Sequence, residues 1–236
     1  MHFRNAAYRD VPSADAFSVW DCVRSADGAK SCGDAIATRD LADGRLALVV
    51  VDALGSGERR ARTAASLAAH VLALLSLDAS PAYALRVADR ELRAGGWHDE
   101  LPPLATLFAA VADAQDGRLR YAAAAHETAL ILSPYGEHRH LRSSGPVGGL
   151  FFDADFPNVD VPFKHGETLV VVTDGIPDSR RDAAFFGTAG TVRSALRALR
   201  TGDDPARTLI DDAVRHGGGA RRDDGAALVV RRTAAC

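Results

Sequence analysis

This 236-residue chain has few cysteines, no long apolar run and no strong excess of either charge. Its three cysteines, Cys22, Cys32 and Cys236, are odd in number and not clustered, which argues against a disulfide framework and a cysteine zinc site. Every apolar run is far shorter than the roughly 20 residues that span a membrane, and the N-terminus lacks a signal-peptide layout. We therefore expect a cytoplasmic protein with reduced thiols and no membrane contact.

The charge balance excludes a further class of partner. A formal net charge of -3 and a pI near 6.2 leave no basic face for nucleic acid. The composition, 47% hydrophobic and 25% charged, is sufficient to bury a full core. Because no linker interrupts the chain, we expect one domain over residues 15–232, with an N-terminal arm over residues 1–14 and a C-terminal tail over residues 233–236.

The most informative stretch is an apolar run that ends at an acid. Leu46 to Val51 predict a strand buried on both faces, and Asp52 follows it directly, before a glycine-rich turn. A carboxylate at the end of a core strand, beside glycines that allow close approach, can hold a metal ion or a phosphate. The same pattern also fits an aspartate that caps the helix which follows.

A hairpin brings a second acid to this end of the sheet. Asp43-Gly44 predict a tight turn between a strand over residues 34–41 and the strand that ends at Asp52. Asp34 and Asp52 lie at similar distances on either side of that turn, so antiparallel pairing places their carboxylates together. Two such acids repel each other unless a cation lies between them.

The same arrangement recurs towards the C-terminus. An apolar strand over residues 168–173 ends at Asp174, and Asp223-Asp224 precede the last apolar strand. Four acidic elements from distant segments, each beside a buried strand, favour one oxygen-rich cluster for hard divalent cations over four unrelated caps. His126, His138 and His140 lack zinc-ligand spacing, and we expect them to be exposed or hydrogen-bonded.

The remaining elements predict a layered protein with antiparallel strands. Ala16 to Ser25 predict a first strand, and hairpins are expected at Asp116-Gly117 and around residues 134–136. Because these strands are consecutive, we expect meander-like sheets instead of a doubly wound sheet. Helices are expected over residues 57–77, 80–94, 189–200 and 204–216, where Ser80 and Asp204 are the N-caps of the second and fourth.

Three arginines open the first of these helices. Arg59, Arg60 and Arg62 lie where the helix dipole disfavours cations, which could indicate an anionic partner nearby. A solvated helix face is the alternative, and we prefer that interpretation.

Six motifs in order resemble the SpoIIE-like and RsbU-like branch of the PPM metal-dependent protein phosphatases. They are GD (33–34), VVDALGSG (50–57), LRYAAAAHE (119–127), SGPVGGLF (144–151), VVVTDGIPDSR (170–180) and RDDGAALVV (222–230). The resemblance extends from about residue 18 to residue 232, and the ordered set is far more specific than any one motif. It implies an α+β fold, a four-layer α-β-β-α sandwich of two antiparallel sheets, with two Mn²⁺ or Mg²⁺ ions and serine/threonine phosphatase activity.

The resemblance also assigns residues. Asp52 resembles the carboxylate that bridges both metals, and the backbone carbonyl of Ala53 its partner on one of them. Asp174 and Asp223 resemble ligands of the other metal, and Asp34 the acid of the GD motif, whose contact can run through water. The paired ions would convert a bridging water into the attacking hydroxide. Asp52 and Asp174 are therefore the expected catalytic residues.

Other features of the family have no match. Leu54 stands where many eukaryotic members have a histidine as general acid, and no arginine matches a phosphate ligand; Arg24 and Lys30 are candidates only because they lie near the GD motif. The usual substrate in this branch is a phosphorylated STAS-domain anti-sigma-factor antagonist. One alternative is a weak or inactive phosphatase-like module that binds a signalling partner. Another is a hydrolase of a small phosphorylated molecule, which needs a narrow pocket.

Overall fold

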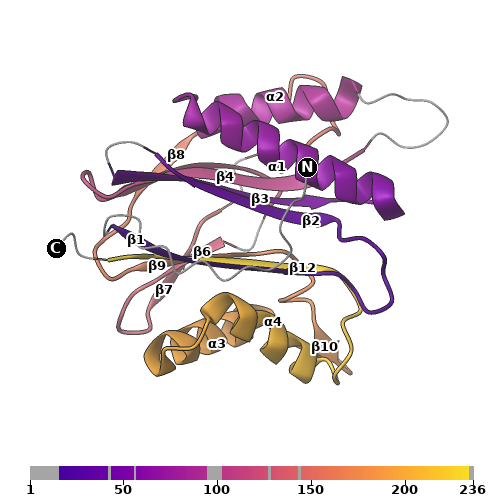
Figure 1. Cartoon of the computed structure of the whole chain (residues 1–236), viewed down its shortest axis with the longest axis vertical. Helices are drawn as coiled ribbons and strands as arrows, with labels where there is room; N and C mark the ends of the chain where they lie inside the picture. The colour runs from indigo at the N-terminus through magenta and orange to yellow at the C-terminus, as the bar shows by residue number, and fades with distance from the viewer. Residues whose placement is uncertain are drawn as a thin grey trace.

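The computed structural model describes residues 16–41, 44–55, 57–94, 103–126, 129–142 and 145–233. Two five-stranded antiparallel sheets face each other, and a pair of helices covers the outer face of each sheet (Figure 1). The predicted four-layer α-β-β-α sandwich is therefore confirmed. None of the helices in these ranges is long and apolar enough to cross a membrane.

The first sheet is a meander with one added edge strand. Its strands, in spatial order, are Asp34–Asp40 (β2), Arg45–Ala53 (β3), Ala105–Asp113 (β4), Arg118–Ala124 (β5) and Val159–Pro162 (β8). The turns predicted by glycine have the positive φ that glycine tolerates, 70° at Gly44 and 63° at Gly117. Asp43, the other half of the first predicted turn, lies outside the described residues.

The second sheet joins strands from both ends of the chain. In spatial order its strands are Phe17–Arg24 (β1), Gly225–Arg232 (β12), Thr168–Val172 (β9), Ala129–Leu132 (β6) and His138–His140 (β7). The expectation of a meander is wrong for this sheet, because only β6 and β7 are neighbours in both sequence and space. Its strands β12 and β9 pair through an apolar run, from Ala227 opposite Val172 to Val230 opposite Leu169, and such uniform runs carry no information about which strand lies beside them.

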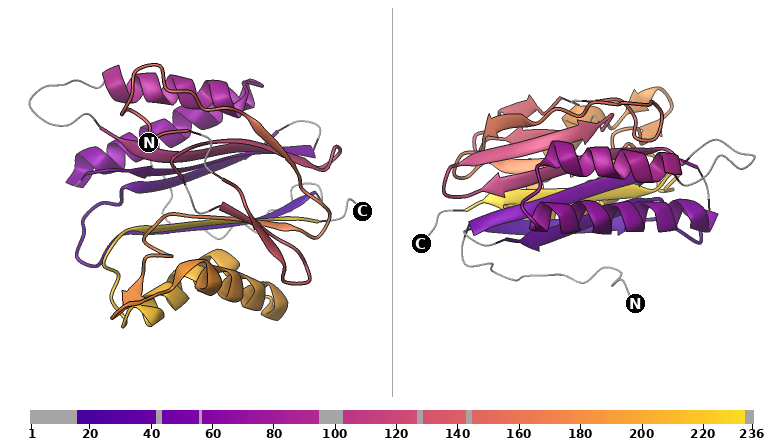
Figure 2. Two further views of the ribbon diagram at one scale, coloured as in Figure 1. Left: turned by 180° about the vertical axis from the view of Figure 1, so that it is seen from behind. Right: turned by 90° about the horizontal axis from the view of Figure 1, so that it is seen from above.

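The helices lie in two separate layers. Gly57–Ser76 (α1) and Pro81–Ala94 (α2) lie side by side on the first sheet, and Gly187–Thr201 (α3) and Pro205–His216 (α4) cover the second (Figure 2). The predicted caps are confirmed. The Asp204 side chain accepts a hydrogen bond from the Arg207 amide at 3.0 Å, and the Ser80 hydroxyl accepts one from the Tyr83 amide at 3.3 Å.

The described residues form three core compartments, and strand β3 separates two of them. Successive side chains of a strand point to opposite faces. Leu48 and Val50 therefore pack between the sheets, while Val49 and Val51 pack under α1 and α2. All four side chains are buried, which confirms the prediction of a strand covered on both faces.

Three short strands were not anticipated. They are β8, which pairs with β5 at the edge of the first sheet, and the hairpin of Arg180–Arg181 (β10) and Ala184–Phe185 (β11). Segments of two to four residues are too short for an alternating pattern to be distinguished from a loop. The expected N-terminal arm and most of the C-terminal tail lie outside the described residues.

Candidate functional site

The two acids of the first hairpin lie opposite each other. In the β2–β3 register Asp34 is the direct partner of Asp52, as the hairpin predicted. The Ala53 amide donates to the Gly33 carbonyl at 2.9 Å, which extends the pairing one step beyond the strand. Asp34 is 7% exposed, so its carboxyl lies inside the protein at this end of the first sheet.

The two C-terminal acids meet at the end of the second sheet. Asp174 follows β9 and Asp223 precedes β12, and these strands are antiparallel neighbours. The Thr173 amide donates to the Ala226 carbonyl at 3.0 Å and continues the pairing towards both acids. A Cβ atom at Gly175 would lie 1.8 Å from the Asp224 carbonyl oxygen, so only glycine permits the chains to approach this closely.

Thr173 connects the acids of the two sheets. Its hydroxyl donates to Asp34 Oδ2 at 2.7 Å and accepts a hydrogen bond from the Ala226 amide at 2.8 Å. Both bonds are buried, so the hydroxyl orientation is fixed and Asp34 is held towards the second sheet. From the sequence, Thr173 was predicted only as the end of an apolar strand, and no local pattern indicated this role.

Asp223 and Asp224 have different environments although they are adjacent. Asp224 is 3% exposed and accepts hydrogen bonds from the amides of Ala26 at 2.8 Å and Gly33 at 2.6 Å. Its other partner is the guanidinium of Arg60. Asp223 is exposed beside Asp174. Asp224 thus anchors the segment that carries Asp34, whereas Asp223 remains available as a ligand.

Arg60 extends from the first turn of α1 into the acidic cluster. A Cβ atom at position 33 would lie 1.8 Å from the Arg60 Nε atom, so the glycine of the GD motif provides the space for this side chain. The preference for a solvated helix face is wrong for Arg60, which is only 19% exposed at its side chain. The solvated face is correct for Arg62, an exposed residue that pairs with Glu58 at 3.4 Å.

The acids raise one another's proton affinity. Burial, followed by the Asp52 carboxylate, raises the pKa of Asp34 to about 8. Burial and the Asp174 carboxylate raise the pKa of Asp52 to about 6. Partial desolvation and Asp223 also raise the pKa of Asp174, while Arg60 acts in the opposite direction on all three acids. The fold therefore gathers negative charge that a divalent cation would stabilise.

The acidic side chains are of the type that binds hard cations, but in the described residues they do not converge closely enough to share one ion. Carboxylates and a backbone carbonyl are the oxygen ligands that Mg²⁺ and Mn²⁺ prefer. In the described ranges no three His, Cys, Asp or Glu side chains are grouped closely enough to hold a metal ion. Cation binding therefore requires the carboxylates to rotate towards one another.

The other candidates make no described hydrogen bond or ion pair with the acids. His126 is buried and shares a 3.1 Å hydrogen bond with Thr106, and the rings of His138 and His140 contact each other on β7. Arg24 lies in β1 opposite Gly225, and Lys30 is exposed. Within the described residues, neither Arg24 nor Lys30 forms a hydrogen bond or an ion pair with any of the four acids.

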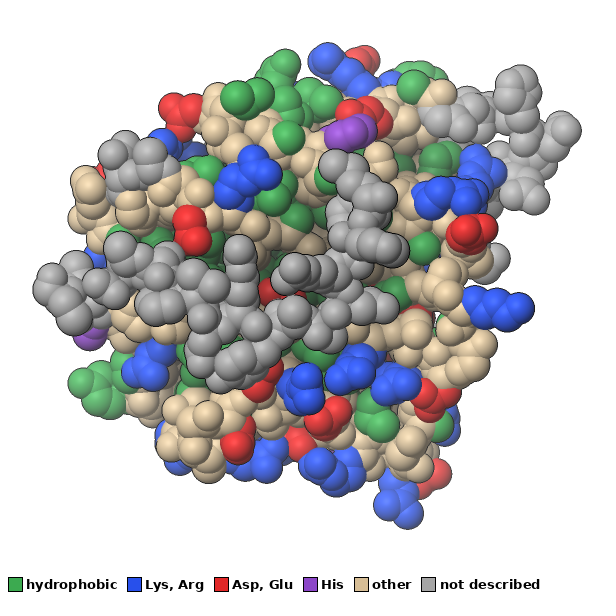
Figure 3. Space-filling model, in the orientation of Figure 1, with side chains coloured by type: hydrophobic (Ala, Val, Ile, Leu, Met, Phe, Trp, Pro, Cys, Tyr) green, Lys and Arg blue, Asp and Glu red, His purple; other side chains and the backbone are tan. Residues whose placement is uncertain are grey.

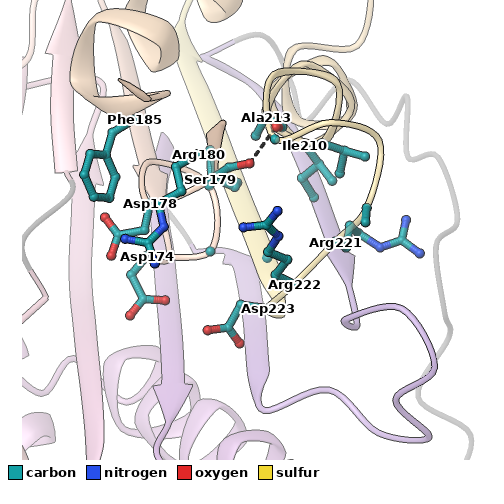
Figure 4. Close-up of a pocket in the computed structure, with 16 residues that line it drawn as sticks. Asp174, Asp178, Ser179, Arg180, Phe185, Ile210, Ala213, Arg221, Arg222 and Asp223 are labelled. Carbon is teal, nitrogen blue, oxygen red and sulfur yellow. Dashed lines mark hydrogen bonds between the residues drawn. The ribbon is translucent and has the colours of Figure 1, made fainter. Parts of the chain in front are cut away.

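A cavity lies beside Asp174 and Asp223 (Figure 4). Its volume is about 320 Å³, and the loop after β9, the β10–β11 hairpin, α4 and the segment before β12 form its walls. Arg180 and Arg222 are among the side chains that line it. A pocket at this position can receive part of a molecule whose phosphate lies against the acids.

Comparison with known proteins identifies relatives of this arrangement. The family model described as Stage II sporulation protein E (SpoIIE) matches residues 42–233. Protein IcfG from Synechocystis sp. (strain ATCC 27184 / PCC 6803 / Kazusa) is 34% identical over 119 residues, which cover 50% of this chain and 18% of IcfG.

Two solved structures have the same fold. The RsbU and RsbW domains of Rv1364c from Mycobacterium tuberculosis match with a TM-score of 0.77 and 22% identity, over 93% of this chain and 61% of that one. The PP2C phosphatase domain of SpoIIE from Bacillus subtilis, with a fragment of its regulatory domain, matches with a TM-score of 0.77 and 18% identity. That match covers 93% of this chain and 64% of the other. The chain thus spans less than two thirds of each of these three relatives.

Proposed function

The chain belongs to the SpoIIE family of PP2C-type serine/threonine phosphatases, and on that premise we propose that it hydrolyses phosphoserine or phosphothreonine on a regulatory protein. The observation that carries this proposal is the convergence of four acids, two from each sheet, at one end of the sandwich. The raised pKa values of Asp34, Asp52 and Asp174 and the central position of Arg60 support a site for added positive charge.

We propose that Asp52 and the Ala53 carbonyl hold one of two Mn²⁺ or Mg²⁺ ions, and that Asp52, Asp174 and Asp223 hold the other. Asp34 completes the set, directly or through water. Divalent cations at such a site lower the pKa of water and neutralise phosphate charge.

The chain's own residues then fix the geometry of the ligands. Thr173 orients Asp34 through its 2.7 Å hydrogen bond, and Asp224 fixes the backbone of the GD motif through Gly33. Residues behind metal ligands commonly tune affinity through such contacts. In this scheme water protonates the leaving oxygen, because Leu54 stands where many eukaryotic members have a histidine.

The substrate class we propose is a phosphorylated STAS-domain anti-sigma-factor antagonist. The relative from Mycobacterium tuberculosis combines an RsbU domain with an RsbW domain, which supports a regulatory protein substrate over a small metabolite. This substrate, the two-ion site and a cytoplasmic location are proposals for this chain.

The test is hydrolysis of para-nitrophenyl phosphate and of a phosphoserine protein with and without Mn²⁺. Asp174→Asn should abolish metal-dependent turnover, because it removes a charged ligand. Asp182→Asn is the matched control. Asp182 is an exposed residue of the β10–β11 turn with φ 55°, a conformation that asparagine adopts equally well. A folded wild type without turnover in any divalent metal would favour the alternative of an inactive module that binds a signalling partner.

A further inference from the structure

The cavity beside the acids is a preformed part of the fold. The Ser179 hydroxyl donates to the Ala213 carbonyl at 2.6 Å, which ties the loop after β9 to α4. The Phe186 amide donates to the Ser179 carbonyl at 2.8 Å, and His216 Nε2 lies 2.9 Å from the Ala184 carbonyl oxygen. These bonds connect the hairpin, the loop and α4, so the cavity walls do not depend on a ligand.

The interior of the cavity is apolar. Ile176, Ile210 and Ala213 are almost completely buried and line it together with Val214. Phe185, in the two-residue strand β11, lies at the edge of the cavity with 53% of its surface exposed. An exposed aromatic ring beside an apolar cavity offers contact area to a bound side chain.

Two arginines on the cavity wall have no acidic partner among the described residues. Arg222 makes no hydrogen bond or ion pair within the described ranges, and Arg180 has only the ring of Phe185, 5.6 Å from its guanidinium carbon. The adjacent Arg221 is different, because it pairs with Asp27 at 2.6 Å. Arg180 and Arg222 can therefore each bind a carboxylate without breaking an existing ion pair.

The local charge balance favours an acidic ligand. Asp174 and Asp223 are assigned to cations, which leaves Asp178 as the one remaining carboxylate among the described lining residues, against Arg180 and Arg222. On the face seen in Figure 3, Lys and Arg side chains are interspersed with acidic ones. In the cavity itself, Arg180 and Arg222 are the groups that can select an acidic ligand.

Resting on the proposed phosphatase function, we propose that this cavity binds the substrate segment next to the phosphorylated residue. An aliphatic side chain of the substrate occupies the apolar interior, and a neighbouring carboxylate pairs with Arg180 and Arg222. The volume of about 320 Å³ is at the small end of ligand pockets, and it suits one or two side chains of an extended segment.

The experiment compares phosphoserine peptides that differ only in their flanking residues. Four peptides are used, and each has the same two residues on both sides of the phosphoserine. The two residues are Leu and Glu in the first peptide, Leu and Gln in the second, Leu and Lys in the third, and Ser and Glu in the fourth. Exposed ion pairs are worth little individually, so we expect kcat/KM for the Glu peptide to exceed that for the Gln peptide by about three- to tenfold. The Leu-Glu peptide should also exceed the Ser-Glu peptide.

Variants identify the arginines responsible. In the double variant Arg180→Gln/Arg222→Gln the ratio of kcat/KM between the Glu and Gln peptides should fall to about one, and in Arg180→Glu/Arg222→Glu the Lys peptide should become the best. A ratio within one variant cancels any general effect on the acids nearby. The matched control is Arg181→Gln, an exposed arginine on the same hairpin that does not line the cavity, which should leave the ratio unchanged.

The outcomes separate the two proposals. Turnover of para-nitrophenyl phosphate together with equal turnover of the Glu and Gln peptides would overturn the cavity proposal and retain the phosphatase. A ratio that Arg181→Gln lowers as much as the double variant would also overturn it. If no substrate is hydrolysed, fluorescence anisotropy with labelled peptides decides. Tighter binding of the Glu peptide that depends on Arg180 and Arg222 supports the cavity, and equal binding of both peptides rejects it.

Discussion

Removing the Asp224 carboxylate should destabilise the protein strongly, even without metal. The side chain is 3% exposed and accepts hydrogen bonds from two backbone amides, Ala26 at 2.8 Å and Gly33 at 2.6 Å, and from Arg60. Asp224→Ala leaves two amides without this acceptor and the guanidinium without its anion. Each lost partner of a buried donor costs about 1–3 kcal/mol, and breaking a buried pair costs about 3–5 kcal/mol.

These costs are not additive, because Arg60 is partly exposed and can turn towards water. We therefore expect Asp224→Ala to lower the free energy of unfolding by about 3–5 kcal/mol, a large share of the roughly 5–15 kcal/mol of a typical domain. Urea unfolding in EDTA measures the loss without a contribution from bound metal. A loss below about 1 kcal/mol would refute the reasoning, because it would mean that the three contacts do not hold the fold.

Asp89 provides a matched control away from the acids. It is also 3% exposed, and it accepts hydrogen bonds from the Gly149 amide at 2.8 Å and from Arg93 Nε at 3.0 Å. Asp89→Ala should therefore destabilise the protein by a similar amount. Added Mn²⁺ should raise the melting temperature of Asp89→Ala as it does that of the wild type, but much less that of Asp224→Ala, whose GD segment is no longer anchored. Equal Mn²⁺ responses in the two variants would show that Asp224 has no role in positioning the ligands.

Three further predictions follow from single contacts. Thr173→Val removes the 2.7 Å hydrogen bond to Asp34 and should weaken Mn²⁺ binding by about tenfold, measured by titration calorimetry; an unchanged affinity would contradict the orienting role. Arg60→Met should lower stability in EDTA yet strengthen Mn²⁺ binding at pH 8.5, because it removes a cation that competes for the same acids. Burial lowers the pKa of His126 to about 4, so its contribution to stability is present above about pH 6.5 and lost as the pH falls towards 4. Urea unfolding at pH 7 and 4.5 should show a loss of about 2–3 kcal/mol in the wild type that His126→Gln lacks, and parallel losses in both proteins would refute this assignment.

The parts of the site that arise from neighbouring segments could be predicted from the sequence. Asp34 and Asp52 are related by one hairpin, so the turn at Gly44 and the alternation of β3 are sufficient to place them opposite each other. The helix boundaries at Ser80 and Asp204 were equally predictable, because caps are local hydrogen bonds.

The parts that depend on distant segments could not be predicted in the same way. Arg60 and Gly33 lie in different elements, and nothing in either segment shows that one side chain occupies the space above the other. The pairing of β12 with β1 and β9 is similar, since the apolar run at the centre of β12 fits several neighbours. The one available signal for Arg60 was its position at a helix N-terminus, where a cation is unfavourable unless an anion compensates it.

The contacts that position the acids cross from one sheet to the other. Thr173, after β9, holds Asp34 of β2, and Asp224, before β12, holds Gly33 at the start of β2. Each sheet alone would contain only two of the acids, without the hydrogen bonds that orient them. The candidate site can therefore form only when the sheets are packed, and any ion that binds it stabilises that packing by mass action. The same coupling predicts that Mn²⁺ protects the amides of Gly33 and Ala226 from hydrogen exchange more than those of β7, which is remote from the acids. Uniform protection over both sheets would indicate that the ion stabilises the domain only globally.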